Sequence, residues 1–154
     1  MPKALLEQEV EAAIVNAFNS ELGTIATAFG FWQPMADGDV KEAGATHVSV
    51  RVSVRANASQ NSRIVSLPVS IVIKCAVEDS ANGDKLIDMA KPIVNLLHSW
   101  NLNSETMSTA LSVSSVFRAD GLVFQDGGDP DFDDALKLWY CPIQIKISGA
   151  ILTT

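Results

Sequence analysis

The sequence predicts an α+β fold: a mostly antiparallel sheet with a long central β-hairpin and two main helices packed on one face. Two periodicities predict it. In 48–54, 65–77 and 139–147, apolar residues occupy every second position, which is typical of half-buried strands. In 3–18 and 86–100, apolar residues recur every three or four positions, which is typical of amphipathic helices. With 154 residues, the chain is expected to form one domain.

The first helix is expected over residues 3 to about 18. Its apolar stripe consists of Leu6, Val10, Ala13, Ile14 and Ala17. The acidic residues of the same segment are expected to point away from this stripe, and they are Glu7, Glu9 and Glu11. The stripe would then be free to cover one face of the sheet.

Residues 19–46 lack a clear period and contain an aromatic cluster. Phe29, Phe31 and Trp32 lie close together in the sequence. Two interpretations are open. The three side chains either anchor a loop to the core or form an exposed contact patch for a partner, because aromatic residues dominate interface hot spots.

The central hairpin is expected to consist of strands at 48–54 and 65–77, joined by a turn-prone segment at 56–62. At about 3.3 Å per residue, the second strand reaches roughly 43 Å, whereas a globular chain of this length is only about 38 Å across. This strand must therefore bend or project beyond the body. Pro68 is the expected position of that change, because proline cannot donate a hydrogen bond to a neighbouring strand.

A second helix is expected to run to about Trp100, with Pro92 kinking or shortening it. A strand is predicted next, at 111–118. Asp120 followed by Gly121 indicates a tight turn into a return strand at 122–125, before the closing strand at 139–147.

Charge is segregated along the chain. Residues 47–77 contain basic residues and no acidic one, whereas residues 120–134 contain aspartates and no Lys or Arg. A solvated face, or folding of the two regions together in one subunit, would account for this split. The sharper hypothesis is a head-to-tail contact between copies that closes into a ring. Its expected contact residues are Arg51, Arg55 and Arg63 on the basic side and Asp129, Asp131, Asp133 and Asp134 on the acidic side.

No catalytic signature is present in the sequence. It contains no nucleophile elbow, Walker phosphate loop, dinucleotide-binding glycine motif or H-E-x-x-H zinc motif, so we expect no enzyme. Asp129, Asp131 and Asp133 match the first ligand positions of a calcium-binding EF-hand loop. The match then fails, because Asp134 and Tyr140 stand where that loop requires glycine and glutamate. We therefore expect no specific metal site and no cofactor.

Composition limits the remaining function classes. The net charge of −7 argues against general nucleic-acid binding, which requires a basic surface. No stretch is long and apolar enough for a transmembrane helix, and the N-terminal segment does not read as a secretory signal. Cys75 and Cys141 fall on the apolar positions of predicted strands, so we expect buried, reduced thiols.

The order of the expected elements has a counterpart among known proteins. An amphipathic helix at 5–18 leads through an irregular segment to the long hairpin at 47–77. A D-x-x-x-G-D-x-L pattern introduces the second helix at Asp79, Gly83, Asp84 and Leu86. A Gly-Gly loop then precedes a closing strand that ends at 147–151. In this order and in these lengths, the chain resembles the tail terminator (tail completion) proteins of long-tailed bacteriophages.

The resemblance implies a non-enzymatic virion structural protein. Its copies would form a hexameric ring on the end of the tail tube, stop tube polymerisation and provide the head-joining surface. The implied partners are further copies of the chain, the tail-tube protein and a head-completion or connector protein, with no membrane and no specific nucleic acid. The implied location is the tail-neck region of the virion, after assembly in the host cytoplasm.

Two other classes remain open. One is another head–tail connector, neck or tail-tube ring subunit, and a tube subunit would polymerise into long tubes by itself. The other is a bacterial ligand-binding domain, which would remain a monomer and present a concave pocket.

Overall fold

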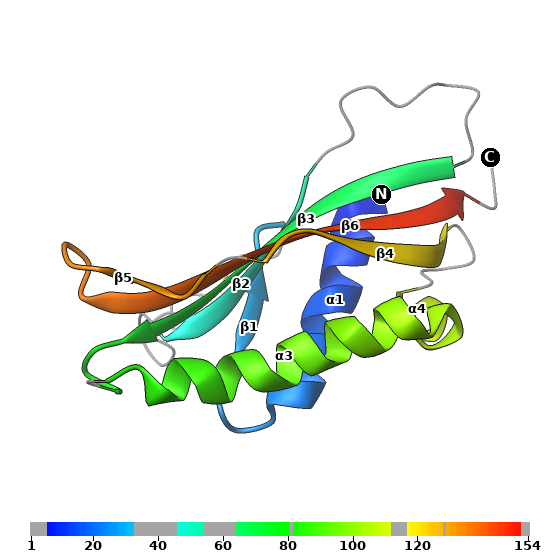
Figure 1. The fold of residues 1–154 in the computed structure, drawn as a ribbon. Helices are drawn as coiled ribbons and strands as arrows, with labels where there is room; N and C mark the ends of the chain where they lie inside the picture. Colours follow the sequence, from blue (N-terminus) through cyan, green and yellow to red (C-terminus); the bar gives the residue numbers. More distant parts are fainter. Residues whose placement is uncertain are drawn as a thin grey trace.

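A computed structural model describes residues 6–32, 46–53, 64–80, 82–111, 117–127 and 129–151. In these ranges, three helices lie on one side of a six-stranded sheet (Figure 1). The helices are α1 (Leu6–Leu22), α3 (Asp84–Leu102) and α4 (Ser104–Leu111). The strands are β1 (Ala28–Gly30), β2 (His47–Val52), β3 (Ile64–Ala76), β4 (Phe117–Gly127), β5 (Asp131–Asp133) and β6 (Leu138–Ile151). The predicted α+β class is confirmed.

The strand order is β1-β2-β3-β6-β4, and β5 also pairs with β6. Every pairing is antiparallel except that of β1 with β2. β2 and β3 pair antiparallel, as the predicted hairpin requires, with His47 opposite Lys74 and Val52 opposite Val69. The predicted turn at 56–62 lies outside the described residues. The sheet is therefore mostly antiparallel, and β3 and β6 are its centre.

Pro68 marks the end of the pairing between β2 and β3. The backbone N–H of Ser53 donates to the carbonyl of Pro68 at 3.0 Å, but Pro68 has no N–H to return the bond. β3 itself continues, because it pairs with β6 from Ile64 opposite Ala150 to Ala76 opposite Leu138. Within the described residues, β3 therefore continues past the last residue of β2 and is paired with β6 along its whole length. That it bends or projects beyond the body stays a prediction from its length.

The core lies between the helices and one face of the sheet. On β3, the odd-numbered residues from Val65 to Cys75 are buried, which confirms the predicted alternation. Across the core, Phe18 of α1 stacks on Trp100 of α3 with ring centroids 6.4 Å apart. Both cysteines, Cys75 and Cys141, are buried free thiols, as expected.

The structure corrects the predicted helices. Glu7 and Glu11 of α1 are buried, each only 1% exposed, although both were expected to point away from the core. α3 continues through Pro92 to Leu102, so this proline does not shorten it. The hydrogen bond that Pro92 cannot make would reach the carbonyl of Asp88, an exposed residue that water can satisfy.

The strand predicted at 111–118 is confirmed at Phe117 and Arg118, which begin β4, but its predicted start is wrong. Leu111 ends the helix α4 instead of beginning a strand, and residues 112–116 lie outside the described ranges. Asn103 explains the error, because its side-chain oxygen accepts hydrogen bonds from the N–H groups of Glu105 and Thr106 at 3.1 and 3.3 Å. The residue that ends α3 thus caps the start of α4.

No hairpin turn occurs at Asp120 and Gly121. β4 runs without interruption from Phe117 to Gly127, and its register against β6 shifts between Ala119 and Gly121. Asp120 is the extra residue of a β-bulge. The turn signal was therefore overridden by pairing with the last residues of β6, which extend far enough to hold the whole of β4.

At Gly149, β4 comes too close to β6 to leave room for a side chain. A Cβ atom there would lie 2.4 Å from the buried Phe117 ring and 2.5 Å from the carbonyl oxygen of Arg118. We expect Gly149→Ala to lower the free energy of unfolding by about 2 kcal/mol, because a backbone atom cannot move aside. Gly121→Ala is the matched control, since its nearest neighbour, Ser148 Cβ, is 3.9 Å away. Urea titration of both variants tests this, and equal losses would contradict it.

Candidate functional site

The face of the sheet opposite the helices carries the basic residues of the central strands. Figure 1 shows α1, α3 and α4 together on the other side. On β2, β3 and β6, the side chains of this open face alternate with the buried ones. The following residues of this open face lie around Arg51 and toward β5: Phe29, Phe31, His47, Ser49, Arg51, Ser70, Lys74, Tyr140, Gln144 and Lys146.

Arg51 is the basic contact residue that the structure describes, since Arg55 and Arg63 lie outside the described ranges. Its side chain is exposed, and its guanidinium carbon lies 4.5 Å from the centroid of the Phe31 ring. This is cation–π geometry, which limits the conformations available to both side chains. Arg51 and Phe31 therefore form one unit, here called the Arg51–Phe31 pair.

The aromatic cluster turns out to be anchored and partly exposed at once. The Trp32 indole N–H donates to the carbonyl of Val52 at 3.0 Å, and the Phe29 ring meets His47 edge to face. The backbone N–H of Phe31 donates to the carbonyl of Val50 at 3.0 Å. The Phe31 side chain nevertheless remains 54% exposed. Phe29 and Trp32 are thus anchored, as the first interpretation expected, and a partner contact of the exposed Phe31 stays a prediction.

Beneath this cluster lies the buried carboxylate of Glu11. It accepts hydrogen bonds from the backbone N–H groups of Phe31 and Trp32. A Cβ atom on Gly30 would lie 2.6 Å from one Glu11 oxygen, so this carboxylate requires glycine beside it. Burial raises the pKa of Glu11, although the two hydrogen bonds and the charge of Arg51 act in the opposite direction. Glu11 therefore positions the Arg51–Phe31 pair from below.

The sequence contained a signal for the buried glutamates. Glu7, Glu11, Ile14 and Phe18 follow one another at intervals of four, three and four residues, the spacing of a single helical face. An apolar period that includes two acids indicates acids with buried partners. The partners of Glu11 lie some twenty residues away along the chain, and so the sequence gives no local indication of them.

The acidic contact residues gather around β5 and the turn that follows it. β5 pairs with β6, so Asp131 lies opposite Tyr140 and Asp133 opposite Leu138. The Tyr140 hydroxyl donates to Asp131 at 3.3 Å, and the charge of Asp131 raises the pKa of Tyr140. Asp129 is exposed nearby. The structure thus brings the predicted acidic residues to one end of the sheet.

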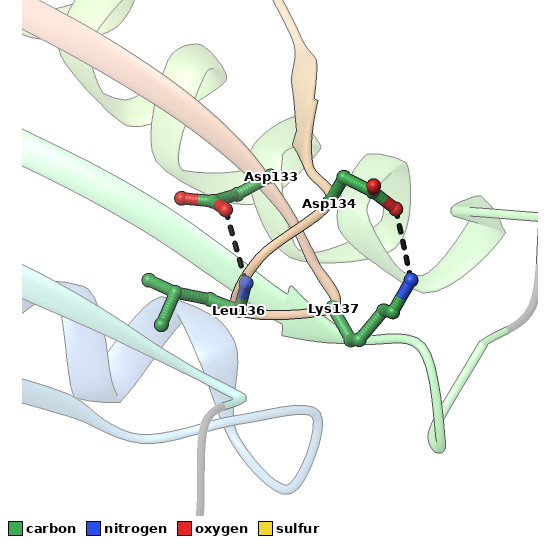
Figure 2. A network of polar contacts seen from close by, with 4 residues as sticks. All are labelled: Asp133, Asp134, Leu136 and Lys137. Carbon is green, nitrogen blue, oxygen red and sulfur yellow. Dashed lines mark hydrogen bonds and ion pairs between the residues drawn. The ribbon is translucent and has the colours of Figure 1, made fainter.

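One basic residue accompanies the acidic turn. Lys137 forms an ion pair with Asp134 at 2.8 Å, while Asp133 accepts a hydrogen bond from the Leu136 N–H at 3.0 Å (Figure 2). Both charged groups of the ion pair are largely exposed, at 68% and 86%, and so the pair contributes little stability. Asp134 is partly neutralised within the subunit, and Asp133 instead shapes the turn.

Arg51 does not meet the acidic residues inside one subunit. β3 and β6 lie between β2 and β5, which places these two strands roughly 14 Å apart at about 4.8 Å per strand. Along the strands, Arg51 is level with Gln144 whereas Asp131 is level with Tyr140, an offset of roughly 13 Å. Both separations exceed the Debye length of about 8 Å at physiological ionic strength. Arg51 and Asp131 are therefore not placed to neutralise each other within a subunit, whereas Lys74 of the same basic region lies level with Asp131, opposite Tyr140.

The described residues gather no group of side chains suited to holding a metal ion. Within the described ranges, no three His, Cys, Asp or Glu side chains are placed to hold a metal ion. His98 contacts Phe124, whereas His47 contacts Phe29. Burial raises the pKa of both thiols, Cys75 and Cys141, which opposes thiolate formation.

Comparison with known proteins supplies no family. No protein-family model matches the chain, and no curated protein matches it either. None of the helices in the described ranges is long and apolar enough to span a membrane. Function is therefore inferred from the two charged surfaces and their placement.

The raised pKa of Glu11 predicts an unusual pH dependence of stability. Because its carboxyl binds a proton more tightly in the folded chain than in the unfolded one, its contribution to stability falls as pH rises from the usual value of 4.5 through the folded pKa. We expect the unfolding free energy of the native protein, minus that of Glu11→Gln, to be larger at about pH 5 than at about pH 7.

Denaturant titrations at both pH values measure this difference. Glu21→Gln, at the exposed end of α1, is the matched control and is expected to show a smaller pH-dependent difference. A difference for Glu11 that stays constant, or that grows toward neutral pH, would contradict the assigned direction.

Proposed function

We propose that the chain is a non-enzymatic structural subunit that assembles head to tail into a closed ring. One observation carries this proposal: the exposed Arg51 and the acidic residues around β5 lie at separate places on one rigid sheet, too far apart to pair within a subunit. Arg51 and Asp131 do not pair with each other in one copy, and each is available to the next copy.

The separation is compatible with two symmetries. A two-fold contact would join Arg51 of each copy to the aspartates of the other, because residue i meets residue j and residue j meets residue i. A head-to-tail contact instead joins the basic patch of one copy to the acidic patch of the next. Repeated contacts of this kind close into a ring when the rotation between copies permits.

The biological role follows from the resemblance to tail terminator proteins. In this proposal, the ring sits on the end of a tail tube in the neck region of a virion, stops tube polymerisation and presents the surface that the head joins. The tail-tube protein and a head-completion or connector protein are its further partners. No cofactor is needed for such a role.

The depression at the start of α3 does not favour the ligand-binding alternative. It is lined mostly by polar and charged side chains, namely Thr24, Ile25, Ser80, Asp84, Lys85, Asp88, Lys91 and Pro92. Small-molecule sites are lined predominantly by apolar side chains with a few polar groups. This set of side chains is not typical of a small-molecule site.

Charge reversal tests the proposed contact. We expect Arg51→Glu alone, or Asp131→Lys with Asp133→Lys, to weaken self-association by about tenfold or more, because each places like charges face to face. The variant with all three substitutions restores opposite charges and should recover the rings. Lys91→Glu, exposed on α3, is the control with the same charge change.

Negative-stain microscopy and solution mass provide the readout. Closed rings of the native protein that dissolve on single reversal and return in the triple variant are the expected result. A native protein that remains monomeric at every concentration, or rings indifferent to the reversals, would contradict the proposal. Long tubes would instead identify a tube subunit.

A further inference from the structure

The turn between β5 and β6 presents an apolar side chain beside its acids. Leu136 is 67% exposed, a large apolar surface left in water. The Asp133 carboxylate accepts the N–H of Leu136, and the next residue, Lys137, has a φ of 55°. Figure 2 shows the Leu136 side chain and the Asp133 carboxylate on one side of the turn, and the ion pair of Asp134 with Lys137 on the other.

The Arg51–Phe31 pair presents the complementary combination. Phe31 is an exposed aromatic surface, and the Arg51 guanidinium lies over its ring. The hydrogen bonds to Glu11 fix the Phe31 backbone from the core side. Aromatic and arginine side chains held in place before binding lose little conformational freedom on contact, which is characteristic of interface hot spots.

We propose that Leu136 of one copy packs on Phe31 of the next copy, with Asp133 facing Arg51. This inference rests on the proposed ring and names the residues at the centre of its contact. Each side offers one exposed apolar group next to one charge, and the charges are opposite. Asp134 is already paired with Lys137, which leaves Asp133 as the carboxylate on the Leu136 side of the turn.

A double-mutant cycle measures this pairing. Leu136→Ser and Phe31→Ser should each weaken self-association by about tenfold, and the variant with both substitutions should lose less than the product of the two effects. Leu102→Ser, at the end of α3 where the leucine is 88% exposed, is the control with the same chemical change and should assemble normally. Independent effects of the two substitutions, or a Leu136→Ser variant that assembles like the control, would overturn the inference.

Disulfide trapping locates the contact. Copies carrying Phe31→Cys are mixed with copies carrying Leu136→Cys under mild oxidation, and we expect a disulfide between the two kinds of subunit. Mixing Phe31→Cys with Leu102→Cys should give none, and the native thiols are buried. Equal cross-linking in both mixtures, or none in either, overturns the named contact.

The two levels of the proposal fail in different ways. Native rings that persist while Leu136 and Phe31 prove uninvolved would remove this contact and leave the ring intact. A native protein that stays monomeric would remove the ring itself, and that result needs no substitution at either residue.

Discussion

The pairing of β3 with β6 is the constraint on which the rest of the structure depends. Every residue from Ile64 to Ala76 has a partner on β6, so the two strands form a single stiff ribbon. β2 and β1 attach to one side of this ribbon, and β4 and β5 attach to the other. The basic and acidic surfaces are consequently held on opposite sides of it, and their separation is fixed by strand pairing. In the proposed ring, each of these surfaces meets the other on a neighbouring copy.

Buried charge supports the same arrangement from within. Placing the Glu11 carboxylate in the core costs free energy, as the rise in its pKa shows, and two backbone N–H groups offset part of that cost. Those N–H groups belong to Phe31 and Trp32, which follow the short edge strand β1. The buried Glu11 side chain, which would weaken an ordinary helix–sheet contact, thereby fixes the position of the exposed Phe31. Burying Glu11 costs stability but gives Phe31 a defined position, a compromise typical of functional sites.

The parts of the fold that were predictable depend on local order. Alternation in β3 predicted both the strand and its buried face, because burial at every second residue is a property of the strand itself. The wrong predictions arise where contacts with residues far away in the sequence determine the local structure. Asp120 forms a bulge instead of a turn because β4 pairs with β6 on both sides of it. Glu11 is buried because the backbone N–H groups that bind its carboxylate belong to a distant segment. The acidic cluster was visible in the sequence, but its distance from Arg51 depends on strand order, which no local pattern specifies.

Hydrogen–deuterium exchange across a concentration series would test the central claim most directly, because it needs no substitution and reports on every peptide at once. The account predicts that raising the concentration slows exchange in two separate regions together, one containing Phe31 and Arg51 and the other containing residues 131–137. Exchange that slows in only one of these regions would contradict a contact between the two. Exchange that slows in neither region, or that slows on the exposed side of α3 instead, would contradict the account.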